Sequence, residues 1–326
     1  MMSRDPEDAD MGAETASVEQ DATSNTPRVA PAKSANGKTG FWRMAFLPIV
    51  TAVLVLVVGG VAVLYVLDTL APIRRTIYGG ATARCEAARL ANCRGVDFRL
   101  NLRQADLMQA DLRQASLVNV DLSLANLEQA DLRGADLRLA ILEGANLNSA
   151  QLGQAILTQA RLNGAVLARA NLNRAVLQQA SFDNADLSQA NLSGASLQGA
   201  NFLRANLSGV NLAGAVFSGA NFIGADLSGA TITGITQGGA NFSQANLSGA
   251  TITGVSFQGM NFSQADLSKA KLTGSNLSQT NFTGASLEGA DLSNADLTNT
   301  DLTQAVIAGA TFSGAKRDGC KGCPTG

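Results

Sequence analysis

The chain has 326 residues, a formal net charge of −2, four cysteines and no histidine. Because histidine is the commonest general base and the commonest metal ligand, its absence argues against an enzyme or a metal centre of the usual kind. A near-neutral charge balance also argues against nucleic-acid binding, which needs clustered Lys and Arg. We therefore predict no cofactor, no metal site and no nucleic-acid partner.

Residues 1–40 contain almost no bulky apolar side chains and are rich in Asp, Glu, Ser, Thr, Ala and Pro. Such a segment cannot bury enough surface to offset the entropy of ordering, so it is predicted to be a disordered polar tail. The GKT sequence at 37–39 resembles the end of a phosphate-binding loop. That motif requires glycine five residues before Gly37, where Ala32 stands. We predict no nucleotide site there.

Residues 41–67 combine an aromatic flank with an apolar run, in which 44–67 are 24 uncharged, mostly apolar residues. A helix of that length spans roughly 36 Å, which is enough to cross the hydrocarbon core of a bilayer. The run starts too late and is too long for a cleaved signal peptide. The sequence therefore predicts a single-pass transmembrane helix that is retained and attaches the protein to a membrane.

Basic residues flank the apolar run on both sides, with a small excess before it. Those before it are Arg28, Lys33, Lys38 and Arg43, and those after it are Arg74, Arg75 and Arg84. By the positive-inside rule, this distribution favours a cytoplasmic tail and an extracytoplasmic C-terminal body. Residues 68–90 are predicted to be a linker with a short cap helix near its end, because the composition there favours helix.

From Leu100 the chain repeats the pattern Ala-(Asp/Asn)-Leu-x-x every five residues. Between Leu102 and Phe312 there are 43 centre positions, of which 30 are Leu, nine Phe, three Ile and one Gln. Two residues before the centre, 34 of the 43 positions are Ala. A five-residue period fits neither a helix nor a strand. It fits a coil in which one small and one large apolar side chain point inward from each pentapeptide.

A longer period, four times the short one, is superimposed on it. Phenylalanine recurs at every fourth centre, at Phe182, Phe202, Phe222, Phe242, Phe262 and Phe282. Residues 231–250 and 251–270 are identical at 13 of 20 positions. Four pentapeptides therefore make one turn of a four-sided solenoid of about 11 coils, roughly 50 Å long at strand spacing. The phenylalanines should stack inside, and Asn201, Asn221, Asn241, Asn261 and Asn281 should stack beside them.

The repeat tract, residues 91–315, resembles the pentapeptide-repeat family. The resemblance implies an all-β fold, a right-handed four-sided β-helix. Near its start, the units 91–95 (ANCRG) and 96–99 (VDFR) continue the pattern, but the second is one residue short. We therefore expect an irregular first coil. Residues 316–326 then form a short tail that contains two cysteines.

Paired carboxylates are the first candidates for chemistry. Asp111 and Asp131 are separated by one full turn and should stack on one face, with Asp106 and Asp136 nearby. Acid–base catalysis needs a cleft and environments that separate the two pKa values, which the convex face of a rod does not provide. We interpret these residues as solvated and predict no catalytic site.

The four cysteines lie in two pairs at opposite ends of the repeat tract: Cys85 with Cys93, and Cys320 with Cys323. This separation argues against a four-cysteine zinc site within one chain. Two disulfides, one at each end, are expected if the body faces an oxidising compartment. Free thiols are the alternative, and a redox role for Cys320–Cys323 lacks the helix N-terminus that lowers a thiol pKa.

Gln237 is the one polar residue at a centre position. Ile235 replaces the usual inward Ala before it, and Gly238–Gly239 follow it. Because a buried amide without partners costs about 1–3 kcal/mol, we hypothesise that Gln237 bonds to the coil backbone or is turned outward by a bulge. A ligand contact is the alternative.

These features predict a membrane-tethered interaction module, not an enzyme, whose flat polar faces bind a macromolecular partner, most simply a protein. The resemblance implies an alternative, a DNA mimic that binds topoisomerases and protects them from quinolones, which requires a strongly negative rod. Residues 95–319 carry 13 Lys and Arg against 17 Asp and Glu, a weak excess. The C-terminal coil offers little to cover an open β-edge, so self-association through it is also expected.

Overall fold

The computed structural model describes residues 53–58, 61–66, 91–99, 101–235 and 238–324. The chain divides into two units, Met1–Thr69 and Leu70–Gly326, which are described separately. The predicted polar tail, the aromatic flank, the linker with its cap helix, and Gln237 all lie outside the described residues.

In the first unit, the described part of the apolar run is a β-hairpin. Strands β1 (Val53–Val58) and β2 (Val61–Val66) pair antiparallel, with Val58 opposite Val61. The prediction of a helix is therefore wrong for these residues. The physical reason is visible in the sequence, because β-branched valine dominates both strands and a Gly-Gly pair separates them, as in two-residue hairpins. Among the described residues, no helix is long and apolar enough to cross a membrane.

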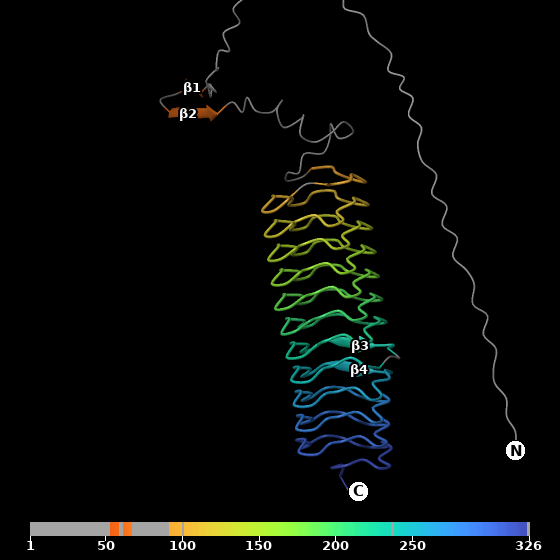
Figure 1. Cartoon of the computed structure of the whole chain (residues 1–326). Helices are drawn as coiled ribbons and strands as arrows, with labels where there is room; N and C mark the ends of the chain where they lie inside the picture. The colour runs from red at the N-terminus through yellow and green to blue at the C-terminus, as the bar shows by residue number, and fades with distance from the viewer. Residues whose placement is uncertain (1–52, 59–60, 67–90, 100, 236–237, 325–326) are drawn as a thin grey trace, which may run out of the picture. The chain divides into compact units, whose positions relative to one another are not determined.

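The second unit is a solenoid of stacked coils (Figure 1). Parallel bridges join the residue before a centre to its equivalent one turn later, such as Asn201 to Asn221. Strands β3 (Thr231–Thr233) and β4 (Thr251–Thr253) pair parallel in the same register. The predicted longer period is confirmed, and with it four pentapeptides per coil.

Each pentapeptide ends in a tight turn that makes one corner of the square. The N–H of Ala110 donates to the carbonyl oxygen of Leu107 at 3.0 Å, and Gln109 between them has a φ of 57°. A positive φ at the third turn residue is what a type II turn requires. Between coils, the Leu107 N–H donates to the Asn126 carbonyl at 2.7 Å. The ladder therefore satisfies the backbone on each side while the turn redirects the chain.

The core is a single column filled by the centre residue and the small residue two positions before it. Almost all of these side chains are fully buried, as Leu142 and Ala140 are. The predicted phenylalanine stack is confirmed: the rings of Phe202, Phe222 and Phe242 lie 4.7–4.9 Å apart and nearly parallel. Phe217 packs edge-on against Phe222 at 5.7 Å. Aromatic contacts thus join successive coils through the middle of the solenoid.

The four sides are named here by their centre residues. Face A is centred on Leu122, Leu142, Leu162 and their equivalents in later coils; face B follows on Leu127 and its equivalents, face C on Leu132, and face D on Leu137. On each face the residue before the centre and the two after it point outward. The residue two after the centre occupies the corner.

The first coil is irregular, as predicted. Asn92 bridges Asp111 and Asp97 bridges Ser116, each one position short of the regular spacing, which Asp106 and Asn126 show. The missing residue thus lies between Asp97 and Asp106, where the unit at 96–99 is short. The coils still stack, and the ladder of parallel bridges continues across the missing residue.

At the other end, the repeat pattern breaks at Arg317, which occupies a centre position on face D. Its guanidinium donates to the carbonyl of Pro324 at 2.8 Å, so the tail folds back beside the last coil. Cys320 and Cys323 form a disulfide with a Cα–Cα distance of 5.8 Å, which confirms the disulfide predicted for this end. Cys93 is disulfide-bonded as well, while Cys85, its predicted partner, lies outside the described residues.

The surroundings of Gln237 depart from the regular coil. Ile235 is 2% exposed, so it fills the inward position as expected, and its carbonyl accepts the Ser256 N–H at 2.7 Å. Gly239 has a φ of 91°, larger than at the equivalent turns on either side. The hypothesis about the Gln237 side chain itself stays a prediction.

Candidate functional site

The outward Asp or Asn before each centre residue has a local structural role. Its Oδ1 accepts the backbone N–H of the residue two positions later, as Asn241 does from Ser243 at 3.0 Å and Asp266 from Ser268 at 2.8 Å. A short side chain with a carbonyl or carboxylate oxygen is the type that makes this turn. This contact explains why Asp and Asn alternate freely there. Such residues support the turn and need no catalytic role.

The same side chains also bond from coil to coil. On face A, Asn221 Nδ2 donates to Asn201 Oδ1 at 2.8 Å. On face B, Asn206 donates in the same way to Asp186 at 3.0 Å. The predicted asparagine stack is confirmed for the face A pair, and face B carries a similar ladder of alternating Asp and Asn. These ladders leave flat faces of ordered amides and hydroxyls.

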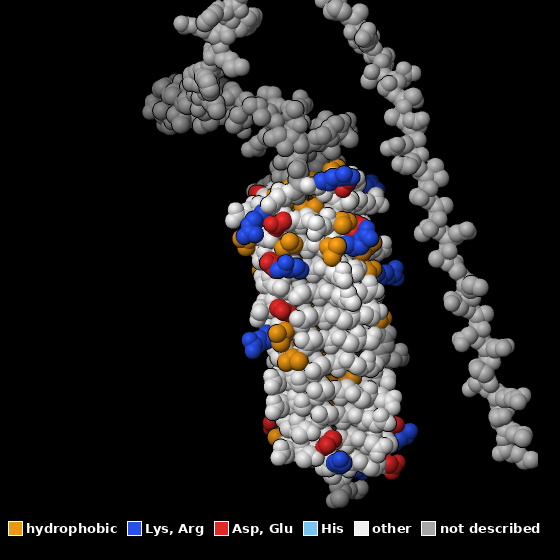
Figure 2. Space-filling view, in the orientation of Figure 1, with side chains coloured by type: hydrophobic (Ala, Val, Ile, Leu, Met, Phe, Trp, Pro, Cys, Tyr) orange, Lys and Arg blue, Asp and Glu red, His pale blue; other side chains and the backbone are white. Residues whose placement is uncertain are grey.

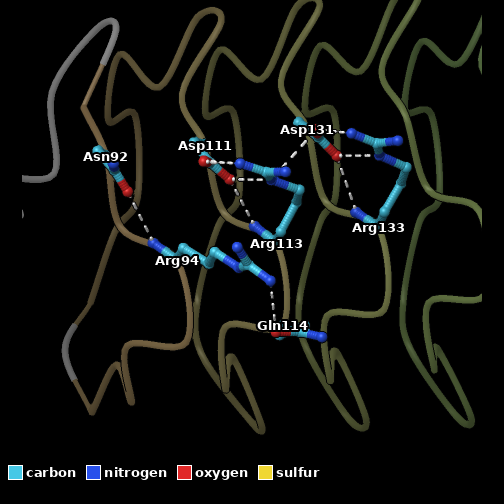
Figure 3. Close-up of polar contacts among 7 residues, drawn as sticks. All are labelled: Asn92, Arg94, Asp111, Arg113, Gln114, Asp131 and Arg133. Carbon is cyan, nitrogen blue, oxygen red and sulfur yellow. Dashed lines mark hydrogen bonds and ion pairs between the residues drawn. The ribbon is translucent and has the colours of Figure 1, made fainter.

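Face C of the first coils carries an ionic ladder (Figure 3). Asp111 accepts two bonds from Arg113, at 2.8 and 2.6 Å, and Asp131 accepts the same pair of bonds from Arg133. The Arg113 Nε also lies 3.5 Å from Asp131, which links the two coils. Arg94, in the first coil, contacts Gln114 instead.

The electrostatics of this ladder oppose acid–base work. Hydrogen bonds from Arg113 lower the pKa of Asp111, and those from Arg133 lower the pKa of Asp131. The pKa of Asp136 is lowered in the same way by Arg138. A general acid needs a raised pKa near neutrality. The structure thus brings Asp111 and Asp131 together on one face, as predicted, but holds both ionised against arginine.

Charge is distributed unevenly along the solenoid. Between Arg204 and Asp266, Asp226 is the single charged residue in the sequence. Figure 2 shows this on the face in view, where most charged side chains gather near the two ends of the solenoid. The middle coils therefore present uncharged Asn, Ser, Thr and Gly surfaces.

The described part of the chain has no group of residues suited to a metal ion, and the depression at its first coil is open. No group of three or more His, Cys, Asp or Glu residues there is placed to hold a metal ion. An open depression of about 460 Å³ lies at the irregular first coil, between Asp97 and Asp121 and beside Val118. Its walls are mostly polar and solvent-facing, so it does not resemble an enclosed small-molecule site.

Two residues that sequence reasoning did not single out are exposed leucines at corner positions. Leu124 and Leu139 are 50% and 48% exposed. Both have the positive φ of the turn, 59° and 60°. The signal was present in the sequence, because the corner position elsewhere holds Gly or a polar residue.

The fold and its surfaces define a class: a four-sided β-solenoid built from five-residue units, with a filled core and polar outer faces. A family model described as "Pentapeptide repeats" matches eight copies between residues 91 and 316. The matched ranges are 91–129, 105–144, 121–159, 145–178, 160–199, 200–236, 240–279 and 280–316. The chain therefore belongs to the pentapeptide-repeat family, whose members fold as right-handed β-helices.

Solved structures of pentapeptide-repeat proteins are similar to the chain. HetL, involved in heterocyst differentiation regulation in the cyanobacterium Nostoc sp. strain PCC 7120, is 32% identical over 63% of this chain and 86% of its own, with a TM-score of 0.33. QnrB1, a plasmid-mediated fluoroquinolone resistance protein, is 17% identical over 62% and 90%, with a TM-score of 0.32. Rfr23 from the cyanobacterium Cyanothece 51142 is 29% identical over 32% and 85%, with a TM-score of 0.22. A search of curated proteins found no match.

Proposed function

We propose that the chain is a non-catalytic interaction module whose solenoid presents its uncharged middle faces to a protein partner. Pentapeptide-repeat proteins are non-catalytic structural modules. The observation that carries the proposal is the combination of a filled core with three coils, between Arg204 and Asp266, that carry a single charge. Such faces offer ordered hydrogen-bonding groups at about 4.8 Å intervals. They carry few charged groups that would have to lose their hydration when a partner binds.

Crosslinking from each face tests this proposal. A photo-crosslinking amino acid is placed in the full-length chain at one equivalent outward position on each face of a middle coil. These positions are Leu203 on face A, Ser208 on face B, Ala213 on face C and Ser218 on face D. The expected result is a crosslinked product of one mass from one or two adjacent faces. Equal products from all four faces, or none from any, would contradict a specific partner.

DNA mimicry is not favoured by the charge pattern. A mimic of the DNA backbone needs closely spaced negative charge along the rod. Here Asp111 and Asp131 of the first coils are paired with arginine, and Asp226 is the single charged residue between Arg204 and Asp266.

Membrane attachment through residues 44–67 is a second part of the proposal. It is supported by the run of 24 uncharged residues, whose described part is an apolar hairpin. The full-length chain should sediment with membranes and resist extraction at high pH, and deletion of 41–67 should release it. Release of the intact chain by alkaline extraction would contradict attachment.

An extracytoplasmic position for the solenoid is supported by the Cys320–Cys323 disulfide, because disulfides persist in oxidising compartments. In intact cells, a membrane-impermeant thiol reagent should label these cysteines only after prior reduction. Labelling that needs cell lysis would instead place the solenoid in the cytosol.

Self-association through the last coil is the third part. In the coil before it, Leu287 and Leu292 donate their N–H groups to Val306 and Thr311 at 2.7 and 2.8 Å. Val306, in this last described stretch of the ladder, is 52% exposed. An exposed apolar side chain beside a sheet edge favours pairing with another strand. Val306→Lys should lower the sedimentation coefficient of concentrated protein, and a strict monomer before mutation would contradict the proposal.

A further inference from the structure

Leu124 and Leu139 are anomalous within the fold. Of the 23 non-glycine residues with positive φ in the described ranges, they alone are aliphatic; the others are Gln, Asn, Ser, Arg or Lys. A left-handed backbone is unfavourable for an L-residue with a Cβ atom, and a half-exposed leucine recovers little of this cost through burial. Neither the turn nor the core accounts for leucine at these corners.

The two leucines flank one row of face A. Leu139 is at the corner that precedes Ile141, which lies in that row and is partly exposed. Leu124 comes from the preceding coil, and its side chain reaches over Gly144 at the opposite corner. A Cβ on Gly144 would lie 2.8 Å from Leu124 Cδ2. Leu124, Leu139 and Ile141 therefore form an aliphatic band across the full width of face A.

Opposite charges lie on either side of this band. Asp121 bridges Ile141, and Ile141 bridges Arg161, so the three form one column across successive coils. The Asp121 side chain is 29% exposed and that of Arg161 is 57% exposed. Arg161 pairs with Glu143 of the preceding coil at 2.6 Å. Its guanidinium has further N–H donors that can bind a second carboxylate.

We propose that the aliphatic band is a docking surface for a second copy of this chain, joined face A to face A in antiparallel orientation. A two-fold axis through the Ile141 row makes the surface self-complementary. Ile141 then meets the same residue of the second copy, and Leu124 and Leu139 meet their equivalents. Asp121 of each copy faces Arg161 of the other, above and below the band.

The charge order selects this orientation. A parallel pairing about an axis along the solenoid would set Asp121 against Asp121 and Arg161 against Arg161, which is repulsive. In the antiparallel pairing, Asp121 of each copy faces Arg161 of the other, so the contacts on both sides of the band are attractive. Glu143 meets its own equivalent near the axis, but Arg161 neutralises it within each copy.

The surface covers about five rows, roughly 19 Å from Asn101 to Ser181 at strand spacing, so it is smaller than a standard interface. The dimer is therefore weak and sensitive to salt.

Site-directed crosslinking of the full-length chain in its native membranes tests the proposal. Ile141→Cys is treated with a short bismaleimide, which needs no change of redox state. Ile156→Cys, at the equivalent position on face D, is the matched control. The expected result is at least tenfold more crosslinked dimer from Ile141→Cys than from Ile156→Cys. Equal yields from the two variants would overturn the proposal.

Second-site changes separate the docking surface from a folding defect. In the Ile141→Cys background, Leu124→Gln with Leu139→Gln should reduce the dimer at least tenfold. Glutamine occupies the equivalent corners of neighbouring coils, at Gln104 for Leu124 and at Gln159 for Leu139, so the thermal midpoint should be unchanged. Asp121→Arg should also reduce the dimer, and adding Arg161→Asp should restore it. Arg169→Asp, an arginine off face A, is the charge control and should have no effect.

A dimer that survives the leucine changes, or that the charge exchange does not restore, would also overturn the proposal. This experiment is independent of the partner proposed above, because that partner is sought on the middle coils with the dimer surface intact. It is independent of end-to-end association as well, since Val306→Lys leaves face A unchanged.

Discussion

The first coils and the middle coils share one backbone and differ in almost everything attached to it. Around Leu122 and Leu142 the core holds Leu and Ala, and the outside carries arginine–carboxylate pairs and exposed leucines. Around Phe222 and Phe242 the core is aromatic, and the outside is amide and hydroxyl. The repeat therefore fixes the hydrogen-bond register and the inward direction of two side chains from each pentapeptide. The outward positions are free to vary, so functional differences between segments must reside there.

The largest contrast should lie in the core. Phe222→Ala removes a ring that stacks on two neighbours, at 4.9 and 4.7 Å, and meets Phe217 edge-on. We expect a loss of about 3–5 kcal/mol in unfolding free energy from burial and cavity formation. The matched change Leu142→Ala, on the same face, should cost about 1 kcal/mol less because no aromatic pairs are lost. Chemical denaturation measures both, and an equal or larger loss for Leu142→Ala would contradict an aromatic contribution.

The amide ladder should give a smaller effect. Asn221 Oδ1 accepts the Ile223 N–H at 3.1 Å, and its Nδ2 donates to Asn201 at 2.8 Å. Asn221→Ala removes both bonds, for an expected loss of about 1–2 kcal/mol. Ser243→Ala on the same face is the control and should change stability by less than about 0.5 kcal/mol. If both variants unfold at the same denaturant concentration as the parent, the ladder contributes no stability.

The smallest effect should be the response of the first coils to acid. Arginine lowers the folded-state pKa of Asp111 and Asp131 below their ordinary value, so their contribution is complete above the unfolded pKa of about 3.9. It is lost as the pH falls through the lowered folded values. Because these pairs are solvent-exposed, the contribution is expected to be about 0.2–1 kcal/mol for each pair.

Hydrogen exchange between pH 5 and pH 2.5, corrected for the intrinsic rate, measures this difference by region. The amides of the first coils should lose protection relative to those between Arg204 and Asp266. Addition of salt at pH 5 should produce a weaker loss in the same region. Uniform loss along the whole solenoid would show that the ion pairs do not distinguish its two parts.

The sequence was sufficient for the features that depend on period. The two nested repeats, of one pentapeptide and of four, lead directly to coil register, the Phe202–Phe222 stack and the Asn201–Asn221 bond, because each coil interacts only with its neighbours. The short unit at 96–99 likewise predicts the irregular first coil. Within this tract, local pattern and global fold carry the same information.

Elsewhere the local pattern was insufficient. An apolar run such as 44–67 fits a spanning helix by length alone, whereas the valine content and the Gly-Gly pair favour the hairpin formed by β1 and β2. Leu124 and Leu139 were not predicted as functional residues because the pattern of inward apolar positions does not include the corner. At the corner, leucine is unusual because of the positive φ of the backbone, not because of its burial. The fold-back of the tail onto Arg317 depends on a tertiary contact that no periodicity encodes.

The register of the coils also has a consequence at the level of the gene. Because every regular coil is completed by four pentapeptides, one coil corresponds to a fixed length of coding DNA. Tandem duplication of that unit lengthens the solenoid and leaves every face aligned. The coils that begin at Thr231 and Thr251 are identical at 13 of 20 positions, as a copied unit would be. Loss of the codons for a single pentapeptide would instead turn everything downstream by one side of the square. Recombination by whole pentapeptides can therefore change which outward surfaces lie next to each other along one side of the solenoid. The inward pattern that builds the core stays the same.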